Sequence, residues 1–137
     1  MKKLFLMSCL AACMVPAHAQ RIDIKPRKDV AQLTGEQIYT QICQGCHMPD
    51  AKGAVGAGRY PALAGDGKLA SAAYPAVMVI NGRGNMPAFG PMLTDAQVAD
   101  VVNYVRTHFG NAYTDSLKPD DVKVFRPPPS SHQPERH

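Results

Sequence analysis

This sequence lacks tryptophan altogether and is poor in other aromatic residues, with five tyrosines and four phenylalanines among its 137 residues. It also lacks a long apolar run. The apolar stretch from Leu4 to Pro16 is too short for a membrane-spanning helix, which needs about 20 residues. Basic residues do not form a stripe interleaved with aromatics, so nucleic-acid binding has no support. The length predicts one domain with tails.

Residues 1–19 are typical of a secretory signal peptide. Met1-Lys2-Lys3 gives a basic start, an apolar run follows, and Ala17-His18-Ala19 is a small-x-small cleavage site. Cleavage would remove two lysines and lower the net charge from +4 to +2. The sequence therefore predicts export to a bacterial periplasm.

Cysteine becomes scarce once the signal peptide is removed. Cys9 and Cys13 lie within it, which leaves only Cys43 and Cys46 in the mature chain. Leu10-Ala11-Ala12-Cys13 also resembles the bacterial lipobox, in which the cysteine is acylated and becomes the N-terminus. A lipid anchor at Cys13 is therefore the alternative to soluble export.

The two remaining cysteines belong to the motif Cys43-Gln44-Gly45-Cys46-His47. This is the attachment signature of a c-type haem, in which both thiols bond to the porphyrin and the histidine becomes an iron ligand. A thioredoxin-like redox pair and half of a zinc site are the alternatives. The first wants a surrounding βαβ pattern and the second another close ligand pair, and the sequence shows neither. One covalent haem c is the predicted cofactor.

Local patterns predict an all-α fold of three to five helices around the haem. After an N-terminal arm (20–33), Thr34 and Gln37 form a capping box, so a helix is expected from about Gly35 into the cysteine motif. Residues 49–67 are rich in glycine and proline and predict an irregular loop. Short helices are expected around 68–73 and 75–81.

The last helix is the clearest. Thr94-Asp95-Ala96-Gln97 repeats the capping box, and Gly110 gives the stop signal. One face carries the apolar stripe Val98, Val101, Val102 and Val105; Asp100, Asn103 and Arg106 are expected on the opposite face.

The compact domain is expected over residues 34–110, with an extension at 111–126 and a disordered proline-rich tail at 127–137. The extension is expected to pack back on the domain through the apolar residues Tyr113, Leu117, Val122, Val124 and Phe125. So small a domain buries little surface. We therefore expect it to depend on the haem for folding.

A second axial ligand should come from far along the chain. Met86 has the best setting, because glycines at 82 and 84 allow a close approach and Pro87 fixes the chain beyond it. Met92 is the second choice, Met78 is expected to pack in the core, and His108 is a rival for a bis-histidine site. Histidine opposite methionine would fill both axial positions and favour electron transfer over oxygen chemistry.

The chain resembles a class I c-type cytochrome over about residues 34–110. The resemblance rests on the cysteine motif, on Pro61-Ala62-Leu63-Ala64-Gly65, on the Gly-x-x-x-Met-Pro setting of Met86 and on Tyr104-Val105. A narrower likeness, to cytochrome subunits of bacterial periplasmic alcohol or sugar-acid dehydrogenases, rests on three segments: Met86-Pro87-Ala88-Phe89, Leu93-Thr94-Asp95 and Asn103 to Asn111.

The resemblance implies a crossing of the first and last helices at Gly35, Tyr39 and Tyr104. It also implies that the Pro61 carbonyl holds the second ring nitrogen of His47. Arg59, Tyr60 and Arg83 lie in loops expected near the haem edge and are candidates to bind the propionates. Lys52, Lys68 and Arg83 are candidates to steer an acidic partner locally.

Three functions remain open from the sequence. The leading one is a single-electron carrier without enzymatic activity, taking electrons from a periplasmic dehydrogenase and passing them to a terminal oxidase or another cytochrome of a respiratory chain. The second is a permanent electron-transfer subunit of a dehydrogenase complex. The third is a haem enzyme or gas sensor with an open iron site, which requires that Met86 does not bind.

Overall fold

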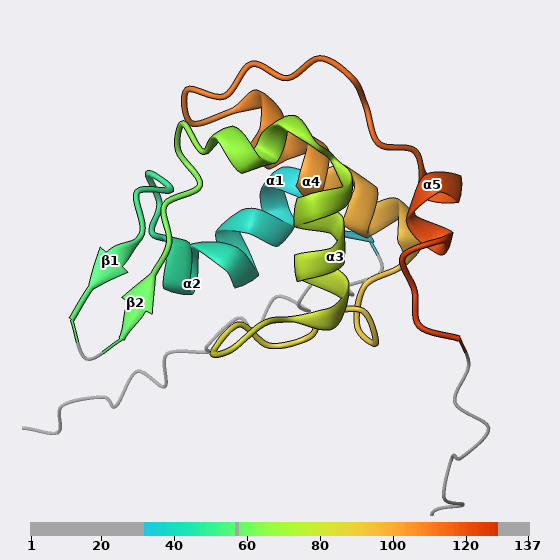
Figure 1. Ribbon diagram of the computed structural model, residues 1–137, viewed down its shortest axis with the longest axis horizontal. Helices are drawn as coiled ribbons and strands as arrows, with labels where there is room; N and C mark the ends of the chain where they lie inside the picture. Colours follow the sequence, from blue (N-terminus) through green and yellow to red (C-terminus); the bar gives the residue numbers. More distant parts are fainter. Residues whose placement is uncertain (1–31, 57, 129–137) are drawn as a thin grey trace, which may run out of the picture.

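A computed structural model describes residues 32–56 and 58–128. Their structure is mostly helical, as the sequence predicted (Figure 1). The predicted signal peptide with Cys13, most of the arm before residue 32, and the tail from residue 129 on lie outside the described residues. Within the described part, no helix is long and apolar enough to cross a membrane.

The first helical segment runs from Gly35 to His47 in three parts. Helix α1 spans Gly35–Ile38, a π-helical turn spans Tyr39–Cys43, and α2 spans Gln44–His47. The predicted capping box is confirmed: Gln37 N donates to Thr34 Oγ1 at 3.3 Å, and Thr34 N donates to Gln37 Oε1 at 3.1 Å. The sequence did not reveal the π-helical turn, a feature that often occurs at functional sites.

The glycine-rich segment after α2 contains a small hairpin where only irregular structure was expected. Strand β1, Ala54–Val55, pairs antiparallel with β2, Arg59–Tyr60. Gly53 makes this approach possible, because its φ is +67° and a Cβ there would lie 2.1 Å from the Tyr60 carbonyl oxygen. The hairpin projects from one end of the molecule beside α2 (Figure 1).

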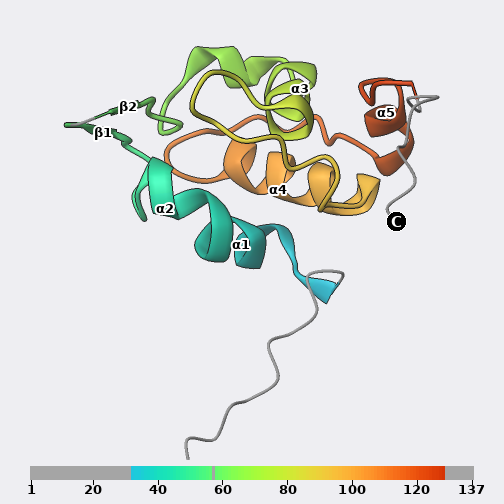
Figure 2. The same ribbon diagram turned by 90° about the horizontal axis from the view of Figure 1, so that it is seen from below.

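Two short helices follow near their predicted positions. A 3-10 helix covers Gly67–Ala70, and α3 covers Ala73–Asn81. The chain then turns at Gly82 and runs back toward α2 before the last long helix begins (Figures 1 and 2). This return brings residues 82–90 beside the site described below.

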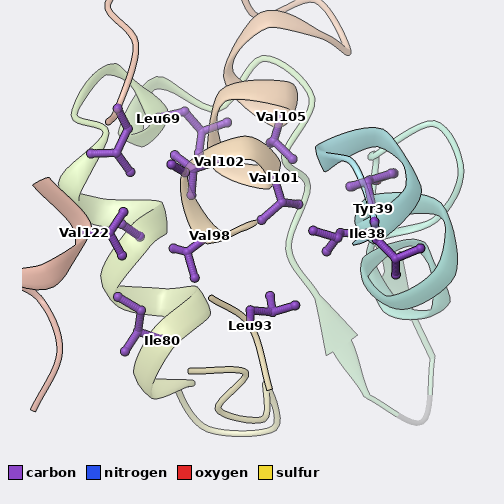
Figure 3. Close-up of a cluster of buried hydrophobic side chains, with 14 of the residues drawn as sticks. Ile38, Tyr39, Leu69, Ile80, Leu93, Val98, Val101, Val102, Val105 and Val122 are labelled. Atoms are coloured by element: carbon purple, nitrogen blue, oxygen red, sulfur yellow. The ribbon is translucent and has the colours of Figure 1, made fainter. Parts of the chain in front are cut away.

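Helix α4, Asp95–Thr107, is the centre of the core. Its valines meet Ile38 and Tyr39 on one side and Leu69, Ile80 and Val122 on the other (Figure 3). The crossing with α1 is close, because a Cβ on Gly35 would lie 2.2 Å from the Asp100 carbonyl oxygen. The Tyr39 and Tyr104 ring centroids are 5.7 Å apart, so the helix crossing implied by the resemblance is confirmed.

One residue of α4 departs from the sequence prediction. Arg106, expected on the polar face, is fully buried. Its Nε donates to the Leu69 carbonyl at 2.8 Å, its guanidinium also reaches the Asp115 carbonyl, and Nη2 lies 2.6 Å from Asp115 Oδ1. The arginine is buried because its donors are satisfied by backbone and carboxylate oxygens from two other segments.

The C-terminal extension wraps back over the domain and contains α5, Pro119–Lys123, a helix that was not predicted from the sequence. Leu117 and Val122 are buried, and Tyr113 and Phe125 pack partly against the core. Val124, grouped with them from the sequence, is 76% exposed because it points away from that core.

Candidate haem site

One cavity brings together the two cysteines, the first-choice iron ligands, Pro61 and the propionate candidates expected from the sequence. It lies among α2, α3, α4 and the loops that follow β2 and α3, and it is lined by Cys43, Cys46, His47, Arg59, Tyr60, Pro61, Arg83 and Met86. These residues lie up to 43 positions apart in the sequence, and the fold brings their side chains to the wall of one cavity.

His47 is positioned by the loop after β2. The ring is buried, and Nδ1 lies 3.0 Å from the Pro61 carbonyl oxygen. Because a carbonyl can only accept, Nδ1 carries the proton and donates, which leaves Nε2 with its lone pair free for a metal. This is the contact that the resemblance implied for Pro61.

The loop that carries Pro61 is fixed to the end of α2. Leu63 N and Ala64 N both donate to the Ala51 carbonyl, at 2.7 and 2.9 Å. Gly53 N donates to the His47 carbonyl at 3.1 Å. These bonds hold the Pro61 carbonyl in front of the histidine ring, a second layer of support typical of metal-binding histidines.

The two thiols are presented by the π-helical turn and α2. Cys43 is partly buried, Cys46 is exposed, and neither forms a disulfide. Burial raises the pKa of the Cys43 thiol to about 11, and the neighbouring Cys46 adds to the rise. In the chain without a cofactor, the Cys43 side chain is therefore a neutral thiol at neutral pH.

Met86 lies in a loop whose backbone is held at several points. Arg83 N donates to the Met86 carbonyl at 3.0 Å, and Met86 N donates to the Arg83 carbonyl at 3.1 Å. Gly82 has a φ of +67°, and a Cβ there would lie 2.4 Å from the Met86 carbonyl oxygen. The loop places a partly buried thioether on the cavity wall.

The rival ligands fall into two groups. Met78 lines the same cavity from α3. Met92 is 54% exposed, and the exposed ring of His108 is stacked on Tyr104 with centroids 4.1 Å apart. Neither Met92 nor His108 is among the described residues that line the cavity. Met78 is thus the competitor that the geometry retains.

The polar rim differs in part from expectation. Arg59, Tyr60 and Arg83 line the cavity, and so does Lys68. Lys52 is instead exposed and lies 3.4 Å from Asp50. Three further polar residues line the cavity without having been predicted, because only their place in a loop or at the start of a helix could have indicated them: Asp66, Tyr74 and Asn85.

The remaining wall is apolar. It is formed by the 3-10 helix, α3, α4 and the loop after Met86, through Leu69, Val79, Phe89, Val101, Val102 and Val105. The valine stripe of α4, predicted as core, therefore also faces this cavity. Such a wall suits a flat, largely apolar ligand better than a hydrated ion.

The donor set fits haem c. Two thiols lie beside an imidazole with a free Nε2, in a cavity with an apolar wall and a cationic rim. Within residues 32–56 and 58–128, no group of three or more histidine, cysteine or acidic side chains gathers to hold a metal ion, as a structural zinc site requires. Once bound through Cys43 and Cys46, haem c supplies an iron that changes oxidation state by one electron.

Comparison with known proteins agrees with this site. Residues 30–105 match the family model described as "Cytochrome C oxidase, cbb3-type, subunit III". The chain is 38% identical over 107 residues to the fructose dehydrogenase cytochrome subunit of Gluconobacter japonicus, a match that covers 67% of this chain but 22% of that protein. It is 33% identical to the gluconate 2-dehydrogenase cytochrome c subunit of Pantoea cypripedii, over 68% of this chain and 24% of that protein.

A smaller relative is matched over most of its length. The chain is 36% identical over 80 residues to cytochrome c6 of Alaria esculenta, a match that covers 53% of this chain and 86% of that protein. In contrast, the chain spans less than a quarter of the two dehydrogenase subunits. On the evidence of the cavity, the cysteine motif and these matches, the chain belongs to the cytochrome c family of electron-transfer proteins and binds haem c covalently through Cys43 and Cys46.

Proposed function

We propose that this cytochrome is a single-electron carrier of the bacterial periplasm whose iron is bound by His47 and Met86. The observation that carries the proposal is that His47, with Nε2 free, and Met86 border one cavity. Two protein ligands leave no open position for oxygen or peroxide, so the site suits electron transfer.

Met86 is favoured over Met78 because of its loop. The turn from Arg83 to Met86 is closed by two backbone hydrogen bonds, and Pro87 restricts the chain directly after the ligand. Met78 belongs to the regular helix α3, where a partly buried methionine is more often a packing residue. Both side chains border the cavity, so the choice is open to a direct test.

The proposed donor is a periplasmic dehydrogenase, and the acceptor is a terminal oxidase or another cytochrome. The likeness to two dehydrogenase cytochrome subunits supports the donor. Arg59, Lys68 and Arg83 at the cavity rim favour a partner with an acidic surface. The predicted signal peptide supports the location, with a lipid anchor at Cys13 as the alternative.

A second candidate is a permanent subunit of a dehydrogenase complex. It is favoured by the same two relatives, which are subunits by name. The match to nearly all of a cytochrome c6 favours the free carrier instead. Purification of the native protein separates them, because a subunit would stay with its dehydrogenase through gel filtration at high salt and a carrier would elute alone.

The test of the iron ligands compares Met86→Ala with Met78→Leu. The ferric wild-type protein should show the weak long-wavelength band of sulfur-ligated haem iron, Met86→Ala should lose it, and Met78→Leu should keep it. Met86→Ala should also bind carbon monoxide readily when reduced. A wild-type protein that lacks the band and binds carbon monoxide would support the open-site enzyme or sensor instead.

A further inference from the structure

Arg126, near the end of the extension, makes three close contacts with one short segment. Its Nε donates to Asp95 Oδ1 at 2.5 Å, Nη1 to the Gly90 carbonyl at 2.6 Å, and Nη2 to the Leu93 carbonyl at 2.7 Å. The Arg126 and Asp95 side chains are only 28% and 25% exposed. Charge-assisted bonds of this kind, partly shielded from water, are stronger than an exposed ion pair.

The segment held by Arg126 is continuous with the Met86 loop. Phe89 N donates to the Val79 carbonyl at 2.9 Å, and Gly90 N donates to the Ile80 carbonyl at 3.1 Å. Leu93 N turns back to the Phe89 carbonyl at 2.9 Å. Only two residues separate Met86 from Phe89, and one of them is a proline. A shift of residues 89–93 therefore reaches the Met86 backbone.

The extension is anchored to α4 independently of Arg126. Asn103 exchanges two hydrogen bonds of 2.9 Å with the backbone of Leu117. Buried Arg106 binds Asp115, and Val122 of α5 is fully buried against the core. Because residues 115–122 of the extension are fixed to the core in this way, Arg126 can restrain the segment that its guanidinium contacts.

We propose that residues 111–126 form a strap that keeps the Met86 loop closed, with Arg126 as the positioning residue for the sixth iron ligand. The inference rests on the proposed ligation by Met86. It predicts that the strap controls how often the methionine leaves the iron, and hence how readily an external ligand takes its place.

The experiment measures imidazole binding to the ferric holoprotein by stopped-flow absorption. At saturating imidazole the rate reports dissociation of the methionine. Arg126→Ala should raise this rate about tenfold, which corresponds to about 1.4 kcal/mol less free energy for loop opening. Arg126→Lys keeps the charge, but its single nitrogen cannot reach all the acceptors that Arg126 contacts through three separate nitrogens. Its imidazole rate should therefore lie between the rates of the wild type and of Arg126→Ala.

The matched control is Lys123→Ala. It removes a cation from the same strap, but its hydrogen-bonded partner is the exposed Asp120 at 2.7 Å, and it interacts with Asp95 only through space, without a hydrogen bond. Its imidazole rate should equal that of the wild type. If Arg126→Ala has the same imidazole rate as Lys123→Ala, while Met86→Ala loses the sulfur band, the proposed role of the strap is wrong. The proposed ligation by Met86 then still holds. A sulfur band retained in Met86→Ala overturns the ligation and the strap together.

Discussion

His47 and Met86 border the same cavity, yet the segments that carry them are held in different ways. The helical segment 35–47 is packed on α4 through buried side chains, among them Ile38 and Tyr39. The ring of His47 is then oriented by a single carbonyl from Pro61. Displacing this ligand requires disruption of the main core.

The Met86 side depends on backbone hydrogen bonds and on polar side chains from the extension. Two backbone bonds join residues 83 and 86, and Arg126 holds residues 90–95. A thioether in this place has no hydrogen bond to orient it. Residues 83–88 can therefore open while α1 and α4 stay in contact, because none of their side chains is buried, whereas Leu93 further along belongs to the core.

The site thus combines His47, which is tied to global stability, with the proposed ligand Met86, which is tied to local stability. Local opening with a lower free energy than global unfolding is common in loops. Changes on the His47 side should therefore lower global stability. Changes on the Met86 side should alter the proposed ligation before they lower global stability.

The largest effect is expected from Cys43→Ser combined with Cys46→Ser, which affects both sides at once. Without the thioether bonds haem is not retained, and the apolar cavity between α2, α3 and α4 loses its filling. Because so small a domain buries little surface by itself, we expect no native tertiary structure. Amide NMR spectra should show collapsed chemical-shift dispersion. A well-dispersed spectrum from the double variant would contradict this dependence on haem.

The next effect is expected at the helix crossing. In Gly35→Ala the new Cβ would lie 2.2 Å from the Asp100 carbonyl oxygen, so α1 must move away from α4. Overpacking of this kind costs about 3 kcal/mol of unfolding free energy. Urea unfolding followed by far-UV circular dichroism measures it.

Gly45→Ala is the control for this change, because a Cβ at position 45 of α2 meets nothing within 4 Å. It should be as stable as the wild type or slightly more so, since alanine favours helix. Both variants should keep the sulfur band. Equal midpoints for Gly35→Ala and Gly45→Ala would refute a role for the close crossing.

The sequence predicted the parts of this molecule that depend on local patterns. Both capping boxes, at Thr34 and Thr94, and the valine stripe of α4 were visible in short windows and are confirmed. The haem cofactor followed from the spacing of Cys43, Cys46 and His47, because that chemistry needs adjacent residues. Local rules suffice where both partners of an interaction lie within one or two turns.

The parts that the sequence did not reveal depend on distant partners. Arg106 was placed on a polar face, but it is buried by carbonyls and a carboxylate, one of them 37 residues away. Helix α5 has a proline at its start and acidic residues in its first turn, yet five residues give too short a periodic pattern. Nothing local distinguishes Arg126 from a solvated arginine, although it contacts three acceptors at least 31 positions earlier.

A smaller and more local effect is expected from Gly82→Ala. Gly82 has a positive φ, and a Cβ there would lie 2.4 Å from the Met86 carbonyl oxygen, so the turn that carries the proposed ligand must open. We expect a loss of about 2 kcal/mol in the stability of the closed loop. The sulfur band of the ferric protein should weaken, and global unfolding should change less than in Gly35→Ala.

Gly84→Ala separates the effect of backbone strain at a positive φ from the effect of a steric clash with the Met86 carbonyl. Gly84 also has a positive φ, of +59°, but a Cβ there meets nothing within 4 Å. It should therefore weaken the sulfur band less than Gly82→Ala does. A stronger effect at Gly84 than at Gly82 would show that the contact with the Met86 carbonyl is unimportant.

The smallest effect is expected from Tyr39→Phe on the His47 side. The Tyr39 hydroxyl donates to the Met48 carbonyl at 2.8 Å, and losing this bond should cost about 1 kcal/mol of unfolding free energy at neutral pH. Burial raises the pKa of Tyr39 to about 12. The folded state thus favours the neutral phenol, and this stabilisation, complete below the ordinary pKa of about 10, is lost as the pH rises toward 12.

The gap in stability between wild type and Tyr39→Phe should therefore narrow above pH of about 10. Urea unfolding of the reduced protein at a series of pH values measures it. Tyr113→Phe is the control, because its hydroxyl makes only a long contact of 3.4 Å with the Asp66 carbonyl. Parallel stability curves for wild type and Tyr39→Phe up to pH of about 11 would show that burial of this phenol does not couple the His47 side to pH. The sulfur band should be the same in both proteins at neutral pH, because Tyr39 supports the segment that carries His47 and leaves the Met86 loop untouched.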